Sequence, residues 1–201
     1  MNPAVVIVVA YLLGSIPFAL IAGRLNGVDL RTVGSGNLGA TNVFRTLGRT
    51  WGVGVMLLDI AKGTAAVLIA EALTSNPWPL VAGALAILGH VFPVWTGFRG
   101  GKGVATGAGA LIGLVPVASG VLLIMWVVVV ILTRYVSVAS VAAALAAAPL
   151  AWAFGAPWPY VVFIALIGLF VITKHRGNIR RLMNGTESRI QFGRKDAPGA
   201  T

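Results

Sequence analysis

Apolar positions in this sequence gather into long blocks that alternate with short polar stretches. The blocks cover residues 3–23, 51–73, 79–97, 104–133, 136–153 and 158–173. A helix of about 20 apolar residues is long enough to cross a bilayer, so the pattern predicts a spanning helix for most of these blocks. We therefore expect an all-α integral membrane protein.

The fourth block, 104–133, is half again longer than one crossing needs. Gly113 and Pro116 interrupt it in its first third. If the chain turns back near Pro116 it has seven transmembrane helices, and if it does not it has six. The segment 104–115 would be about 18 Å long as a helix, so we expect a short, tilted or re-entrant helix there.

Lys and Arg residues distinguish the two topologies, because the cytoplasmic loops of membrane proteins carry an excess of them. With seven spans, every Lys and Arg except Lys62 falls on one side of the membrane. These residues lie in the loops at about 24–50, 98–103 and 134–136 and in the tail 174–201. The turns on the opposite side, near 74–78, 116 and 154–157, contain none. The sequence therefore predicts seven helices in one membrane-embedded domain over 1–201, with the N-terminus outside and the C-terminus cytoplasmic.

Composition narrows the functional classes. Of the 201 residues, 58% are hydrophobic and 10% are charged, whereas a soluble domain is typically about 25% charged. The net charge is +10, but the chain has no basic helix and no aromatic RNA-binding motif, so cytoplasmic loops and an anionic substrate explain the excess better than nucleic acid. The absence of cysteine excludes disulfides and thiolate chemistry, and two histidines with scattered acids predict neither a metal site nor a cofactor.

Four polar clusters lie on the predicted cytoplasmic side. The first is "RTVGSGNLGATNVFRTLGR", residues 31–49, which offers hydrogen-bond donors from Ser35, Asn37, Thr41 and Arg45. The second half of this stretch predicts a short helix with Thr41 or Asn42 as its cap, and free N–H groups at a helix start attract anions. The alternative is a flexible polar loop.

The second cluster is "GFRGGKGVATG", residues 97–107. A nucleotide-binding P-loop needs GxxxxGK followed by Ser or Thr, and this stretch is one residue short and has Gly103 in the last position. Nucleotide hydrolysis is therefore a poor fit. Gly100, Gly101 and Gly103 would still let an anion approach the backbone, with Lys102 as the charge. The alternative is a basic turn that contacts anionic lipid head groups.

The third and fourth clusters are "RYVSVAS", 134–140, and "KHRGNIRRLMNGTESRI", 174–190. Ser137 and Ser140 are three positions apart and share a helical face, and so do His175 and Asn178. Taken alone, the serines are as well explained by helix packing and His175 by an interfacial position. Together, the four clusters indicate a phosphate site at the cytoplasmic membrane surface.

Two ionisable residues lie inside the second block. Asp59 and Lys62 are three positions apart and are predicted to pair within the bundle. The pair is either functional or a structural ion pair that positions the first loop. His90 and Pro17 are predicted to be structural, as a satisfied histidine and a helix kink.

The motifs "GSIPF", "GSGNLGATNVFRTLG", "GHVFPVWTGFRGGKGVAT", "RYVSVAS" and "HRGNIRRLMNGTESRI" occur in this order over about residues 11–194. Together they resemble the bacterial PlsY family, the acyl-phosphate:glycerol-3-phosphate acyltransferases. The resemblance implies a seven-span inner-membrane enzyme whose active site faces the cytoplasm. It would transfer a fatty acyl group from acyl phosphate to the 1-hydroxyl of sn-glycerol 3-phosphate, giving lysophosphatidic acid and phosphate. The resemblance implies no cofactor, nucleic acid or obligate protein partner.

The motifs of the family match particular residues here: Ser35, Asn37, Thr41 and Arg45 in the first, Gly100, Gly101, Lys102 and Gly103 in the second, His175, Asn178 and Glu187 in the third, and Ser140 as a separate polar residue. Ser137, one turn away, is an alternative to Ser140. These residues are predicted to bind the two phosphate-bearing substrates.

The predicted catalytic residues are His175, Lys102 and Arg45. We expect Lys102 and Arg45 to neutralise the phosphates, with hydrogen bonds from Ser35, Ser140 and Asn178. Backbone amides of the turn 100–103 would stabilise the leaving phosphate or the oxyanion. His175 has an unperturbed pKa suited to a base at neutral pH; the alternative is that a substrate phosphate takes the proton and His175 only binds.

Two rival functions fit the sequence less well. A transporter of phosphate or an organic phosphate would show inverted repeats and a binding site near the bilayer midplane, whereas no repeat is visible and the polar groups gather at one face. Glycerolipid acyltransferases of the other class use an HxxxxD motif. Trp95 and Arg180 stand five positions after the two histidines, so that motif is absent.

Overall fold

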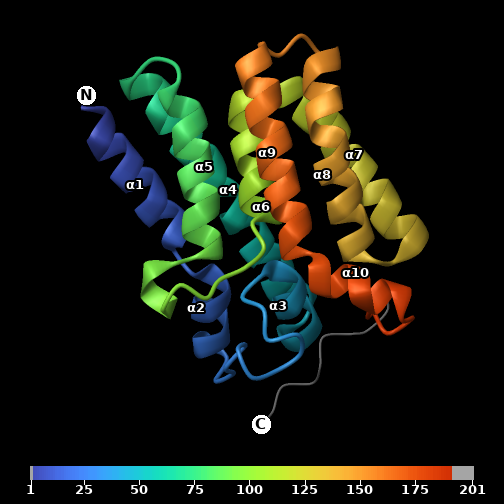
Figure 1. Cartoon of the computed structure of the whole chain (residues 1–201). Coiled ribbons are helices and arrows are strands. Elements are labelled where there is room, and N and C mark those ends of the chain that lie inside the picture. The colour runs from blue at the N-terminus through green and yellow to red at the C-terminus, as the bar shows by residue number, and fades with distance from the viewer. Residues whose placement is uncertain (1, 192–201) are drawn as a thin grey trace.

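The computed structural model describes residues 2–191, and within this range the chain is helical without a strand (Figure 1). The helices are α1 Pro3–Ser15, α2 Phe18–Leu25, α3 Ala40–Leu47, α4 Arg49–Leu73, α5 Trp78–Val91, α6 Val104–Leu114, α7 Pro116–Thr133, α8 Val136–Ala153, α9 Trp158–Lys174 and α10 Arg176–Met183, with a short 3-10 turn η1 at Val94–Thr96. The predicted all-α class is confirmed.

Five segments of the described chain are long and apolar enough to cross a membrane: Pro3–Leu25, Arg49–Leu73, Trp78–Thr96, Pro116–Thr133 and Val136–Ala153. Helices α9 and α10, which meet at an angle of 55°, add a sixth if they count as one span. The α6 helix has only 11 residues. Length and composition therefore support five or six spans, and a count of seven depends on the short α6.

Two predicted interruptions of the helices are confirmed. The fourth apolar block breaks at Val115, so that α6 ends at Leu114 and α7 begins with Pro116. The first block breaks before Pro17, between α1 and α2. Both breaks have the same cause, because proline has no N–H for a helical hydrogen bond and its ring crowds the preceding turn.

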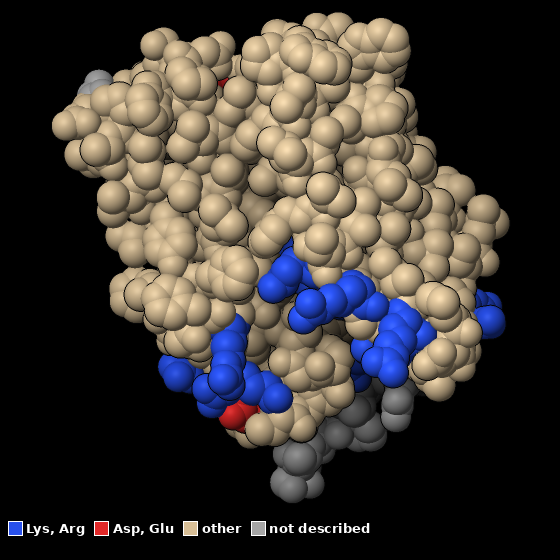
Figure 2. Space-filling model, in the orientation of Figure 1, with Lys and Arg blue, Asp and Glu red and all other residues tan. Residues whose placement is uncertain are grey.

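The basic residues gather at one end of the bundle. In Figure 1 the N-terminus and the turns near 74–77 and 154–157 lie at the upper end, while α2, α3 and α10 lie at the lower end. On the face shown in Figure 2, the Lys and Arg side chains lie in the lower half, and the broad region above them shows no Lys or Arg. Arg194 and Lys195, on which the predicted orientation also relies, lie outside the described residues.

The helices pack as two groups, with α1, α4, α5 and α6 in one and α7, α8 and α9 in the other. Within the first group α4 and α6 touch backbone to backbone. A Cβ on Gly63 would lie 2.1 Å from the carbonyl oxygen of Thr106, and one on Gly109 would lie 1.9 Å from that of Ile60. Only glycine permits such an approach, which seats the short α6 against α4 in the manner of small-residue packing in membranes.

Candidate active site

A cavity of about 440 Å³ lies between the two groups of helices. At its polar end it is lined by Ser35, Asn37, Thr41, Arg45, Lys102, Gly103, Ser137, Ser140, His175, Asn178, Arg181 and Glu187. The rest of its wall is mostly apolar and comes from α3, α4, α6, α7, α8 and α9, with Asp59, His90 and Ser119 as further polar residues. All four polar clusters therefore meet at one cavity that continues into an apolar channel.

The first loop is held by the side chain of Asn42, which is buried in α3. Its Oδ1 accepts a hydrogen bond from the Ser35 N–H at 2.9 Å, and its Nδ2 donates to the carbonyl oxygens of Leu30 and Val33 at 3.1 and 3.2 Å. The predicted cap at Thr41 or Asn42 is wrong, because α3 begins at Ala40 with Gly39 as its N-cap. Asn42 instead fixes the loop that carries Ser35.

Arg45 projects from α3 into the cavity wall. One terminal nitrogen donates to the carbonyl oxygen of Ser188 at 2.8 Å, while the Nε is buried and has no hydrogen-bond partner among the described residues. Burial lowers the pKa of Arg45, but a guanidinium stays protonated in proteins. An unpartnered donor on a half-buried cation is well suited to an anionic ligand.

The second loop places its glycines in two different roles. The N–H groups of Gly100 and Gly101 donate to the carbonyl oxygens of Val91 and His90, both at 3.1 Å. These two amides satisfy the end of α5, so the prediction that they bind phosphate does not agree with this arrangement. Gly101 is not part of the cavity wall and Gly100 lines only a smaller neighbouring cavity, whereas Lys102 and Gly103 do line the main cavity.

Lys102 is the cation at the centre of the polar end. Its ammonium donates a hydrogen bond to Oδ1 of Asn178 on α10. Burial lowers the pKa of Lys102 to about 8; Glu187 opposes this shift, and the positive charges of Arg181 and Arg45 add to it. A lysine in this state gains its full charge when an anion binds beside it.

Glu187 joins α8 to α10 at the rim of the cavity. Its Oε1 accepts hydrogen bonds from Asn178 Nδ2 at 2.6 Å and from Ser137 Oγ at 2.8 Å, and its Oε2 accepts one from Arg181 Nε at 2.7 Å. Burial alone would raise the pKa of Glu187, but these hydrogen bonds and the charge of Arg181 outweigh it and lower the pKa. The carboxylate therefore orients Asn178, and through it Lys102.

Arg181 is a functional candidate that the sequence did not single out. Arg181 lies three residues after Asn178 and shares its helical face, a spacing that could have identified it. For the serine, the sequence left Ser137 and Ser140 as alternatives. Ser137 bonds to Glu187, whereas Ser140 donates to the Val136 carbonyl at 2.8 Å and accepts from Trp126 at 3.3 Å.

His175 lies between α9 and α10 and is 3% exposed. Its Nδ1 is 2.8 Å from the carbonyl oxygen of Val171. A carbonyl can only accept, so Nδ1 carries the hydrogen in the neutral ring and Nε2 carries the lone pair. This tautomer fits a residue that accepts a proton from a ligand in the cavity, which His175 lines.

No group of three His, Asp or Glu side chains suited to a metal ion occurs within residues 2–191. The cavity wall offers cations, hydrogen-bond donors, the histidines His90 and His175 and the carboxylates of Asp59 and Glu187, next to an apolar channel.

Comparison with known proteins identifies the family. A family model described as "Glycerol-3-phosphate acyltransferase" matches residues 4–185, which is most of the chain. The chain belongs to the glycerol-3-phosphate acyltransferase family. One curated relative is the glycerol-3-phosphate acyltransferase of Agrobacterium fabrum. It is 47% identical to this chain over 188 residues, which cover 93% of this chain and 91% of the relative. Another, from Geobacter sulfurreducens, is 47% identical over 193 residues that cover 95% and 99%.

Two solved structures of a family member share this fold. Both are crystal structures of PlsY (YgiH), described as an integral membrane glycerol 3-phosphate acyltransferase, one in the glycerol 3-phosphate form and one in the lysophosphatidic acid form. The first superposes with a TM-score of 0.91 at 40% identity and the second with 0.88 at 38%, each covering 95% of this chain and 96% of the other. This member of the glycerol-3-phosphate acyltransferase family therefore has the fold of an integral membrane protein.

Proposed function

We propose that this chain transfers a fatty acyl group from acyl phosphate to the 1-hydroxyl of sn-glycerol 3-phosphate, giving lysophosphatidic acid and inorganic phosphate. The observation that carries the proposal is the cavity, which joins a cationic polar end directly to an apolar channel. One substrate is a small polar anion, and the other has an anionic head and a hydrocarbon tail. The family, whose solved members include glycerol 3-phosphate and lysophosphatidic acid forms, supports the same conclusion.

The polar end offers enough positive charge for two phosphate groups. Lys102, Arg45 and Arg181 line the cavity, and its two carboxylates already have partners: Glu187 in its hydrogen-bonded cluster and Asp59 in its ion pair with Lys62. The acyl chain would lie in the channel between α6, α7, α8 and α9. Holding both anions with the reacting atoms adjacent would supply much of the acceleration, since positioning in favourable intramolecular models contributes up to about 7–11 kcal/mol.

In the proposed reaction the 1-hydroxyl oxygen of glycerol 3-phosphate attacks the acyl carbonyl carbon. The bond from that carbon to the phosphate oxygen then breaks, and phosphate leaves with the electron pair. Phosphate has a pKa near neutrality, so its departure needs little acid catalysis. With the Gly100 and Gly101 amides bonded to α5, the oxyanion is stabilised by the Lys102 ammonium.

The hydroxyl proton passes to Nε2 of His175 in this proposal. The hydrogen bond from Nδ1 to Val171 favours the tautomer with a free lone pair on Nε2. The rival acceptor is an oxygen of the leaving phosphate, and substitution of His175 separates the two. Ser35, Asn37 and Thr41 would bind the phosphates from the first loop, where they line the cavity.

We also propose the topology. The chain would form one domain in the bacterial inner membrane with seven spans, α6 being a short one, the N-terminus outside and the active site facing the cytoplasm. The concentration of Lys and Arg at the end of the bundle that carries α2, α3 and α10 supports this orientation.

The experiment that tests the function is phosphate release by purified protein in lipid vesicles. Palmitoyl phosphate and palmitoyl-CoA are compared as donors, each with glycerol 3-phosphate. We expect turnover with the acyl phosphate alone, and lysophosphatidic acid formed in equal amount to phosphate. Turnover only with the CoA ester would contradict the proposed donor, and no turnover with either would contradict the function.

A further inference from the structure

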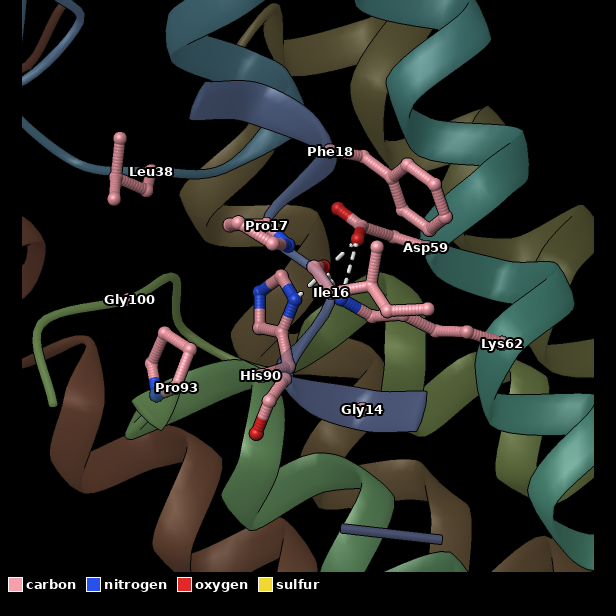
Figure 3. Close-up of a pocket in the computed structure, with 11 residues that line it drawn as sticks. Gly14, Ile16, Pro17, Phe18, Leu38, Asp59, Lys62, His90, Pro93 and Gly100 are labelled. Atoms are coloured by element: carbon pink, nitrogen blue, oxygen red, sulfur yellow. Dashed lines mark hydrogen bonds and ion pairs between the residues drawn. The ribbon is translucent and has the colours of Figure 1, made fainter. Parts of the chain in front are cut away.

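A cluster of buried charges lies on α4 and α5 at the edge of the active-site cavity, whose wall includes Asp59 and His90. Asp59, Lys62 and His90 are 2%, 4% and 7% exposed. The Lys62 ammonium is 2.8 Å from Asp59 Oδ1, and His90 Nδ1 is 3.4 Å from the same oxygen (Figure 3). The adjoining cavity is only about 10 Å³, the size of about one water molecule. It is therefore too small to be a second substrate site.

Lys62 ties this cluster to the break between α1 and α2. Its ammonium donates to the carbonyl oxygen of Ile16 at 2.9 Å and lies 5.5 Å from the ring centre of Phe18. Pro17 has no N–H to continue the helix, and the Ile16 carbonyl accepts from the Phe18 N–H at 3.2 Å as well as from Lys62. In Figure 3 the side chains of Lys62, Asp59 and His90 converge on Ile16 and Pro17. The cluster thus fixes the segment that leads through α2 into the first loop.

His90 ties the same cluster to the second loop. Its carbonyl oxygen accepts a hydrogen bond from the Gly101 N–H at 3.1 Å. A Cβ on Gly101 would lie 2.1 Å from Nε2 of the imidazole ring, so the ring packs directly against the backbone at this position. Lys102 is the next residue. The imidazole therefore sets the position of the turn that aims Lys102 into the cavity.

We propose that Asp59, Lys62 and His90 form a positioning cluster that holds the two substrate-binding loops in register with each other. Stability alone gives a weak explanation of such a cluster, because a buried ion pair can often be replaced by apolar residues at no cost. The position of the cluster gives a better explanation. The Asp59–Lys62 ion pair anchors the α1–α2 break, and His90, which lies beside Asp59, supports the turn before Lys102. These three residues act through the loops and do not touch the phosphates in this scheme.

The inference rests on the proposed function, because its readout is the KM for glycerol 3-phosphate. The variants are Asp59→Asn, Lys62→Met and the double variant, measured in the phosphate-release assay and by thermal unfolding. Asp59→Asn leaves the buried Lys62 without a counter-ion, and Lys62→Met leaves the Asp59 carboxylate with only His90 beside it, so each single change lowers the Tm. The double change removes both charges, so the Tm recovers. We expect its KM for glycerol 3-phosphate to remain at least about tenfold raised, since displacement of a binding group by about 1 Å can cost about 100-fold.

A second experiment tests the contact between His90 and the turn. His90→Asn keeps a donor towards Asp59 but shortens the side chain, and Gly101→Ala adds a methyl group where the ring now lies. If the two residues act through this contact, Gly101→Ala raises the KM in the parent but has a much smaller effect in the His90→Asn background. KM effects that multiply independently would overturn this part of the inference.

Thr64→Val provides the matched control. Thr64 donates to the Gly109 carbonyl at 2.9 Å and lies two residues from Lys62 on α4, so its loss lowers stability without touching the cluster. Its KM is expected to stay within about twofold of the parent value, well inside the tenfold change expected for the cluster. A normal KM in the Asp59→Asn/Lys62→Met variant would overturn the inference while wild-type turnover upholds the function. An inactive wild-type protein would instead refute the function itself.

Discussion

The ammonium of Lys102 donates a hydrogen bond to Asn178 Oδ1, although the two residues are 76 positions apart in the chain. Asn178 in turn donates to Glu187, which also binds Ser137. Three of the four polar clusters found in the sequence are thus joined by one line of hydrogen bonds. A change at any of these residues is therefore expected to shift the ammonium of Lys102, which stabilises the oxyanion in the proposed reaction.

Lys102→Ala should nearly abolish the enzyme. The variant loses the charge that neutralises phosphate and the oxyanion, and such electrostatic donors are worth about 10²–10³ in kcat. Steady-state phosphate release in vesicles measures the effect. Lys174→Ala is the matched control, because Lys174 lies over the Phe92 ring and is not part of the cavity wall. Activity of Lys102→Ala within a few fold of wild type would refute the phosphate-clamp role.

The pKa of Lys102, lowered by burial to about 8, predicts an alkaline limit to catalysis. As the pH rises through this value, the free enzyme loses the charge that binds anions. We expect kcat/KM for glycerol 3-phosphate to fall about tenfold per pH unit above about pH 8, as expected for a single titrating group. Lys102→Arg keeps its charge over this range, so its profile should lack the break even if its activity is lower. A wild-type profile that stays level would contradict the assignment.

Much of the fold was predictable because its causes are local. The apolar blocks define the helices, and Pro17 and Pro116 break them at the expected places. The role of α6 was less accessible from the sequence. Its 11 residues are too few to be recognised as an ordinary span, and it is held in the bundle by the close contact of Gly109 with α4. That contact depends on tertiary packing, which hydropathy does not encode.

The site was predictable in composition but less so in its roles. The glycine-rich turn suggested free amides, yet the N–H groups of Gly100 and Gly101 satisfy carbonyls at the end of α5. The end of every helix needs such partners, and the sequence does not show which residues provide them. Likewise, the choice between Ser137 and Ser140 depends on Glu187, which lies 50 positions beyond Ser137.

His175→Ala tests the identity of the base. General-base catalysis is typically worth about 10²–10⁴-fold, so kcat should fall by at least about 100-fold. His175→Asn is the companion variant, because its amide can keep the hydrogen bond to the Val171 carbonyl while the Nε2 lone pair is lost. Both variants should lose activity to a similar degree. If His175→Ala keeps more than about a tenth of the wild-type kcat, the leaving phosphate is the base and His175 only binds substrate.

The apolar channel ends at a cluster of packed side chains. Leu122, Ala147 and Ile164 line the cavity and also belong to one buried hydrophobic cluster, together with Ala151. Ala147 is the smallest of the residues that do both. From Ser137 at the polar rim, α8 rises about 15 Å to Ala147, so this residue lies where the tail of a long acyl chain would end.

Ala147→Phe should therefore shift the enzyme towards shorter acyl donors. Each methylene excluded from an apolar site costs about 0.8 kcal/mol, so the loss of room for two would lower kcat/KM for a long donor by about tenfold. Palmitoyl phosphate and decanoyl phosphate are compared in the same vesicles, and we expect the loss for the first but not for the second. Leu145→Phe, on the same helix at a position 63% exposed on the outer surface, should leave the ratio unchanged. Equal losses for both donors in Ala147→Phe would show that the acyl chain ends elsewhere.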